Sequence, residues 1–189
     1  MPEQTDKRDN ILHTTLHLIV ERGLESTPMS LIASEAAVGM GTIYHYFTSK
    51  EELVNALYRE LKLRVHQAML DGYTADAPLR PRFFRIWRNL FRFYLANPEL
   101  FQFLDQYSLS PVITPESKET GMQLWQEPIR LFQEGHAQQI FKDMPIHLLM
   151  LIANAPLVNL VRGHIEGQVQ LDEPAIAAAI TACWDAVKL

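Results

Sequence analysis

Apolar residues recur at intervals of three and four along almost the whole of this chain, and no long stretch alternates apolar with polar residues. The first spacing places side chains on one face of an α-helix, whereas alternation is the pattern of a β-strand. Leu12, Leu16 and Ile19 are the earliest clear example of the helical spacing. The sequence therefore predicts an all-α protein.

Helix start signals divide the chain into elements. Thr27 before Pro28 predicts a helix N-terminus capped by the threonine, and Ser49 with Glu52 predicts a capping box. The capping box opens a long helix over 49–70. Further helices are predicted over about 81–96, 98–108, 115–141 with a kink at Pro128, 145–167, and from the cap Asp172 to 187.

These elements predict two domains. Three short helices fall within residues 1–50, and helix 49–70 links them to a larger helical domain within 51–189. Longer and more apolar helices follow the proline-containing segment 72–81, which suits a separate core.

Composition and the N-terminal sequence indicate the cellular compartment in which the chain works. A net charge of −5 gives no general attraction to nucleic acid or to anionic membranes. The single cysteine, Cys183, suits a reducing compartment and is interpreted as an inert, small apolar residue. The N-terminus lacks the pattern of a signal peptide, and the apolar stretch 146–161 is shorter and more polar than a membrane span of about 20 residues. We expect a cytoplasmic protein.

The stretch GMGTIYHYFTSKEEL, residues 39–53, is the most unusual in the chain. Two short helices joined by a tight turn precede and include it, which makes a helix-turn-helix candidate. In such a motif the later helix enters the DNA major groove. Gly39 and Gly41 would let its backbone approach the DNA closely, while Ile43 and Phe47 would face the protein interior.

The residues expected at DNA lie on or beside this helix. Lys50 is interpreted as a phosphate contact, and Thr42 as a source of both a methyl group and a hydroxyl for the bases. The complete set is Thr27, Ser30, Gly39, Met40, Gly41, Thr42, Tyr44, His45 and Lys50.

Residues 23–53 resemble the helix-turn-helix of the TetR/AcrR family of transcriptional regulators. The matching positions are Gly23, Thr27, Ile32, Ala33, Ala36, Val38, Gly41, Thr42, Tyr44, Tyr46, Phe47, Ser49, Lys50, Glu51 and Leu53. Ala37 stands where the family usually has glycine, and Gly39 where it usually has serine. The resemblance implies a repressor, a homodimer formed by the last two long helices, and release from the operator by a small effector.

Charge also favours a dimer. Residues 1–50 contain four Lys or Arg against six Asp or Glu, so one subunit has few cations to neutralise phosphates. We therefore expect two subunits on palindromic, double-stranded DNA, with half-sites about one helical turn apart or somewhat more.

Aromatic residues in the larger domain suggest a pocket for a hydrophobic or aromatic effector. The candidate lining residues are Trp87, Phe91, Tyr94, Phe103, Tyr107, Trp125, Ile129 and Phe132, with Asp105, His136 and Asn154 as polar anchors. Each has the alternative interpretation of an ordinary core or surface residue.

Other function classes have less support. The sequence holds no hydrolase, metalloprotease or P-loop motif, so we expect no enzyme, cofactor or metal. His13, His17 and Glu21 share one helix face that suits either a metal or solvent. A helical protein-interaction module that has lost DNA binding remains the alternative, because Gly39 replaces serine and the first fifty residues are acidic.

Overall fold

The computed structural model describes residues 2–189, with side chains from residue 7 onward. Its regular elements are α1 (Pro2–Arg22), α2 (Met29–Glu35), α3 (Met40–Tyr46), α4 (Lys50–Met69), α5 (Leu79–Ala96), α6 (Pro98–Tyr107), α7 (Pro115–Gln123), α8 (Gln126–Ala137), α9 (Ile146–Ile165) and α10 (Glu173–Val187). Across residues 2–189, extended pairing is limited to one isolated bridge between Phe141 and Lys188. The predicted all-α class is confirmed.

Two predicted helix starts are confirmed by their caps. The Ser49 hydroxyl accepts the Glu52 amide at 3.1 Å, and the Asp172 carboxylate accepts the Ala175 amide at 2.9 Å. The capping box differs in one detail, because the Glu52 carboxylate accepts from the amide and hydroxyl of Thr48, each at 2.6 Å, instead of from Ser49. These bonds lower the pKa of Glu52.

Two local predictions were wrong. Thr27 does not cap α2, because Pro28 occupies the N-cap position and the buried Thr27 hydroxyl donates to the Gly23 carbonyl at 2.9 Å. The predicted helix 115–141 is two helices, α7 and α8, separated at residues 124 and 125. Pro128 lies in the first turn of α8, where its missing N–H leaves no helical hydrogen bond broken.

The chain forms two compact units. The N-terminal unit comprises residues up to 62 together with 99–121, and the C-terminal unit comprises 63–98 and 122–189. This division differs from the predicted one because α6 and the segment after it pack with the N-terminal helices. The Tyr107 hydroxyl accepts the Leu24 amide at 3.2 Å, and Asn55 on α4 donates to the Val112 carbonyl at 2.8 Å.

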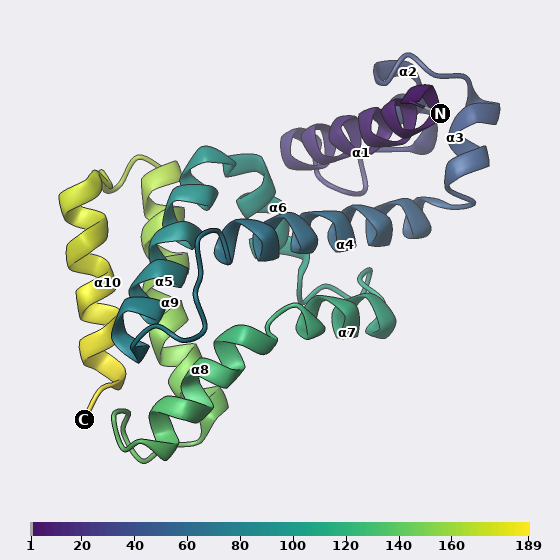
Figure 1. Cartoon of the computed structure of the whole chain (residues 1–189). Coiled ribbons are helices and arrows are strands. Elements are labelled where there is room, and N and C mark those ends of the chain that lie inside the picture. Colours follow the sequence, from purple (N-terminus) through teal and green to yellow (C-terminus); the bar gives the residue numbers. More distant parts are fainter. Residues whose placement is uncertain (1) are drawn as a thin grey trace. The chain divides into compact units, whose positions relative to one another are not determined.

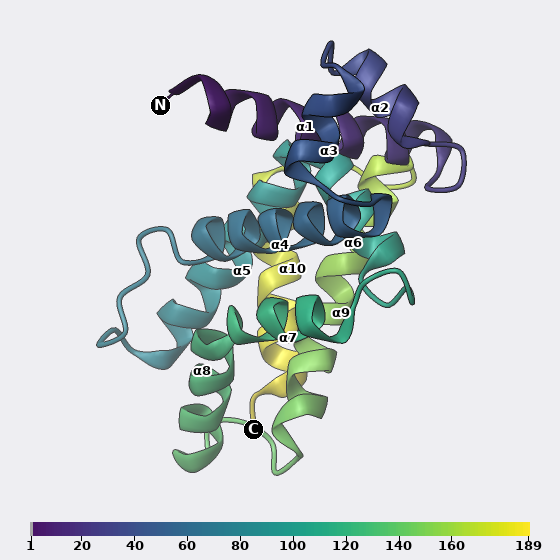
Figure 2. The same cartoon turned by 90° about the vertical axis from the view of Figure 1, so that its right-hand side faces the viewer.

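The N-terminal unit is built on α1, α2 and α3, which lie together in Figure 2. Ile11, Ile32 and Ile43, one from each helix, are completely buried. Gly23, directly after α1, has φ +80°, and Ala37, in the turn before α3, has φ +52°. Both values lie in the left-handed region that favours glycine, so Ala37 is the unusual residue of the two.

The C-terminal unit packs α5, α8, α9 and α10 around an aromatic cluster, and α9 lies beside α10 (Figure 1). Phe83 stacks on Trp87 with ring centroids 4.0 Å apart, and Phe132, Phe141 and Trp184 complete the cluster. At its edge, the buried Arg82 guanidinium donates to the Glu134 carboxylate and to the Tyr73 hydroxyl. Both α5 and α8 are therefore fixed at one point by a charged contact.

Helix α9 is longer than the apolar stretch recognised in the sequence. An 18-residue window of this 20-residue helix has a mean hydropathy of 1.4, so the helix is long and apolar enough to cross a membrane by length and composition alone, a test that the core helix of a soluble protein also passes. Only 28% of this apolar window is buried within the chain. Leu148 and Leu151 are among its exposed residues. This helix therefore presents an apolar surface that the described chain does not cover.

Candidate functional site

Helix α3 is held by one face and exposes the other. Ile43 is completely buried and Phe47, which follows the helix, is 2% exposed, as predicted. On the opposite side Met40 is 42% exposed and Tyr44 is 48% exposed, and His45 is exposed beside them. Ser30, Gly39 and Gly41 are also exposed, and Thr42 is half-buried. These members of the predicted DNA-contact set are therefore exposed or half-buried.

The described residues give no packing reason for the two glycines before and inside α3. A methyl group added to Gly41 would meet nothing within 4 Å, and one added to Gly39 would meet only the Thr42 hydroxyl at 3.9 Å. Gly39 has an ordinary extended conformation, with φ −70°, and Gly41 has no left-handed φ. Neither packing within the described residues nor backbone conformation requires glycine at these two positions.

Thr27 and Lys50 have contacts inside the unit. Thr27 is completely buried, so its side chain does not join the exposed surface. The Lys50 ammonium donates to the Leu24 carbonyl at 2.5 Å, and the Leu24 amide is held by Tyr107. Lys50 is only half-buried, so its side chain also borders solvent. The turn between α1 and α2 is thus fixed from α4 and from α6.

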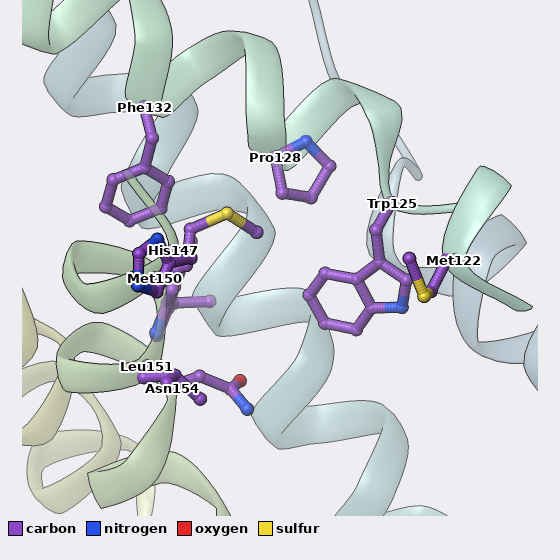
Figure 3. Close-up of a pocket in the computed structure, with 9 residues that line it drawn as sticks. Met122, Trp125, Pro128, Phe132, His147, Met150, Leu151 and Asn154 are labelled. Carbon is purple, nitrogen blue, oxygen red and sulfur yellow. The ribbon is translucent and has the colours of Figure 1, made fainter. Parts of the chain in front are cut away.

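A cavity of about 480 Å³ lies within the C-terminal unit. Trp125 and Met122 lie together at one end, and Phe132, His147 and Met150 lie at the other (Figure 3). The remaining lining residues are Trp87, Pro128, Leu151 and Asn154. The indole N–H of Trp87 is occupied by the Ala153 carbonyl at 2.9 Å. The lining contains no Asp, Glu, Lys or Arg, so the cavity suits an uncharged, largely apolar molecule.

The structure brings only part of the predicted pocket set together. Trp87, Trp125, Phe132 and Asn154 line the cavity. Phe91, Tyr94 and Ile129 lie in the same unit but not in the lining, and Phe91 is completely buried. Phe103 and Tyr107 belong to the N-terminal unit, where their rings contact each other at 5.2 Å. Asp105 is in that unit too, and His136 pairs with Asp143 at 3.3 Å.

Sequence reasoning missed five lining residues: Met122, Pro128, His147, Met150 and Leu151. A usable signal existed for three of them. His147, Met150 and Leu151 precede Asn154 by seven, four and three positions on α9, and these spacings place side chains on one helix face. Met122 and Pro128 are brought to the cavity by the break between α7 and α8, which the sequence did not predict.

One histidine of α1 has a carboxylate partner on another helix. His17 pairs with Glu99 on α6 at 2.8 Å, which raises the pKa of His17. Within the described part of the chain, no group of three or more His, Cys, Asp or Glu side chains is placed to hold a metal ion.

Comparisons with known proteins agree with this arrangement. Residues 11–57 match the family model "Bacterial regulatory proteins, tetR family", and residues 78–188 match "Tetracyclin repressor-like, C-terminal domain". The chain is 23% identical over 186 residues to an uncharacterised HTH-type transcriptional regulator of Haemophilus influenzae, covering 98% of this chain and 97% of the relative.

Two further similar proteins match the chain, one over less than half of it and the other over its whole length. The chain is 32% identical over 80 residues to the HTH-type transcriptional repressor KstR2 of Mycolicibacterium smegmatis, covering 41% of this chain and 38% of KstR2. The crystal structure of a TetR family transcription regulator from Marinobacter aquaeolei VT8 superposes with a TM-score of 0.92 at 28% identity, covering 100% and 99% of the two chains. These relatives are regulators and not enzymes. This chain belongs to the TetR family of DNA-binding, helix-turn-helix transcriptional regulators.

Proposed function

We propose that this regulator is a homodimeric repressor that leaves a palindromic operator when a small, uncharged, apolar compound binds in its C-terminal unit. Helix α3 is the element that enters the major groove, and Ser30, Gly39, Met40, Gly41, Thr42, Tyr44, His45 and Lys50 form the contact surface. Family members act in the cytoplasm on double-stranded DNA, usually as dimers, and relatives such as KstR2 are named as repressors.

The main support for placing α3 at the DNA is the empty space around Gly41. Apart from its chain neighbours and its own helix backbone, a Cβ there would meet no described atom within 4 Å, and it would lie at the start of α3, which also carries the exposed Met40 and Tyr44. An added methyl would therefore keep the backbone away from a bound duplex without disturbing the protein itself.

Gly41→Ala separates DNA binding from folding. Alanine favours a helix over glycine by about 0.5–1 kcal/mol, so thermal unfolding should move to the same or a higher temperature. Affinity for a duplex selected from random DNA should fall at least about tenfold, which corresponds to about 1.4 kcal/mol. Unchanged affinity in a folded variant would remove α3 from the interface.

The dimer surface that we propose is the exposed face of α9 and α10. Leu148 and Leu151 on α9 are 38% and 64% exposed, and Ala178 and Ala182 on α10 are exposed small residues that permit close helix approach. A second copy of this surface would cover the apolar residues, as in other two-fold interfaces.

The effector class follows from the cavity lining. A charged ligand would lose its hydration without meeting an opposite charge, whereas the aromatic and methionine side chains suit rings and alkyl groups. His147 and Asn154 offer hydrogen bonds to one polar end of such a ligand. Helix α4 runs through both units, so it is the element through which binding would change the placement of α3.

The effector proposal is tested with matched aromatic compounds that are neutral, anionic or cationic. We expect the neutral members to raise the melting temperature and to weaken operator binding, and Asn154→Leu to reduce their effect. Stabilisation by the anionic or cationic members alone would reject this ligand class. Failure to enrich any DNA sequence would instead favour the protein-interaction alternative.

A further inference from the structure

The chemistry that α3 can use on DNA is limited by its side chains. Its sequence, MGTIYHY, contains no Arg, Lys, Asn or Gln. Those four residues make the bidentate hydrogen bonds by which proteins distinguish guanine or adenine in the major groove. The preceding helix α2, MSLIASE, contains none of them either. Recognition by this motif must therefore depend on other contacts.

The long exposed side chains of α3 present mainly apolar surface. Met40 and Tyr44 lie four positions apart, on one face of the helix, and are 42% and 48% exposed. Of the other large side chains of α3, Ile43 is completely buried and Tyr46 is half-buried. Thus the surface that faces away from the unit combines a thioether, an aromatic ring and the exposed imidazole of His45.

An apolar side chain in the major groove has one distinctive partner, the C5-methyl group of thymine. Methionine adapts its shape readily and is polarizable, so it packs well against a methyl group. The bare backbone at Gly41, one residue beyond Met40, allows the two to come close. Lys50, at the start of α4, donates to the Leu24 carbonyl and is not part of α3.

We propose that Met40, supported by Tyr44, reads thymine methyl groups, so that each half-site of the operator contains thymine where Met40 contacts a base. This inference rests on the proposed operator binding and names the base class that the site prefers. On this proposal, the polar groups of α3 left for base edges are the half-buried Thr42 hydroxyl and the exposed His45 imidazole.

The experiment first selects bound duplexes from random DNA with the full-length protein. Each thymine of the selected half-site is then replaced by deoxyuridine, which removes the methyl group and leaves base pairing intact. At one or two positions in each half-site, this replacement should weaken binding of the duplex about fourfold, which is the effect expected for one buried methyl group. In Met40→Gln, deoxyuridine at the base that residue 40 contacts should no longer weaken binding. Selection with this variant should favour adenine at that base.

The control variant is Leu109→Gln, which changes another exposed apolar residue of the same unit, 92% exposed and far in sequence from α3. It should retain the wild-type selection and the wild-type deoxyuridine effects. Enrichment of a site at which every deoxyuridine substitution is silent would overturn this inference and leave the operator proposal standing. No enrichment at all would overturn both.

Discussion

Ala37 occupies a conformation that alanine adopts only with strain. Its φ of +52° lies in the left-handed region, where a side chain costs about 1–2 kcal/mol relative to glycine. Glycine would relieve this strain, and its larger freedom in the unfolded chain would offset about 0.4–1 kcal/mol of the gain. Ala37→Gly should therefore stabilise the protein by about 0.5–1 kcal/mol, seen as a rise of about 2 °C in melting temperature.

The neighbouring Ala36 is the matched control for that substitution. It is buried and has an ordinary helical φ of −75°. Ala36→Gly should lower stability by about 1 kcal/mol, because it removes a buried methyl group and weakens the end of α2. Equal effects of the two substitutions would contradict the strain assigned to Ala37.

Gly135 is required by packing, in contrast to Gly41. A methyl group at Gly135 on α8 would overlap the Phe141 ring and lie 3.2 Å from Leu79 Cδ1. Phe141 is itself buried and stacked on Phe132 at 5.1 Å, so it has little room to move. Gly135→Ala should destabilise the protein by about 1–2 kcal/mol in urea unfolding, whereas Gly41→Ala should not. A gain in stability at both positions would contradict this distinction.

These residues show what local pattern can and cannot predict. Burial of Ile43 and Phe47 followed from their spacing, and exposure of Met40 and Tyr44 followed from the opposite face. The same reasoning placed Phe91 in a pocket, but Phe91 is completely buried outside it. Spacing identifies an apolar face, while a cavity depends on how imperfectly several helices fit together.

At the level of elements, the pairing of α1 with α6 predicts a pH dependence. Glu99 raises the pKa of His17 above its ordinary value of 6.5 through a hydrogen bond and charge attraction, while Glu21 adds to this and Arg22 opposes it. A raised folded-state pKa stabilises the protein below about pH 6.5 and ceases to do so as the pH rises through the folded value. Melting temperature should therefore fall between pH 6 and pH 8.

His17→Gln isolates the histidine from the other titrating groups. The variant keeps a polar side chain at an exposed position but has no proton to lose in this range. Its melting temperature should change less between pH 6 and pH 8 than that of the wild type. An identical pH profile for both proteins would show that the pair adds nothing to stability.

Helix boundaries were predictable where a cap is local in sequence. Ser49 and Asp172 cap α4 and α10 as expected, because each cap involves residues three positions apart. The break between α7 and α8 was not predictable in this way. Gly121 on α7 lies so close to α4 that a methyl group would come within 2.9 Å of the Tyr58 hydroxyl, a contact between residues distant in sequence. Such long-range packing overrides local helix preference.

For the whole molecule, the proposed interface on α9 and α10 makes DNA binding depend on pairing of subunits. Ala182→Arg places a charged side chain on the exposed face of α10 without disturbing the core. We expect particles with the 21.7 kDa mass of one chain in light scattering, instead of twice that mass. Operator affinity should fall at least about 100-fold, because the second half-site contact is no longer intramolecular.

Ala137→Arg is the matched control, since Ala137 is an exposed alanine at the end of α8 in the same unit. It should keep both the dimer and operator affinity. A dimer that persists in Ala182→Arg, with normal folding, would move the interface to another surface.

The interleaved course of the chain determines which fragments can be excised. The chain passes between the units at 62–63, 98–99 and 121–122, so neither unit is one continuous segment. A peptide ending at residue 62 would leave behind Tyr107, Val112 and Ser117, which hold Leu24, Asn55 and Arg59. A DNA-binding fragment made by truncation after residue 62 would therefore lack residues that support its own helices. A fusion protein that uses this N-terminal unit must therefore include residues 99–121, connected to residue 62 by a new linker.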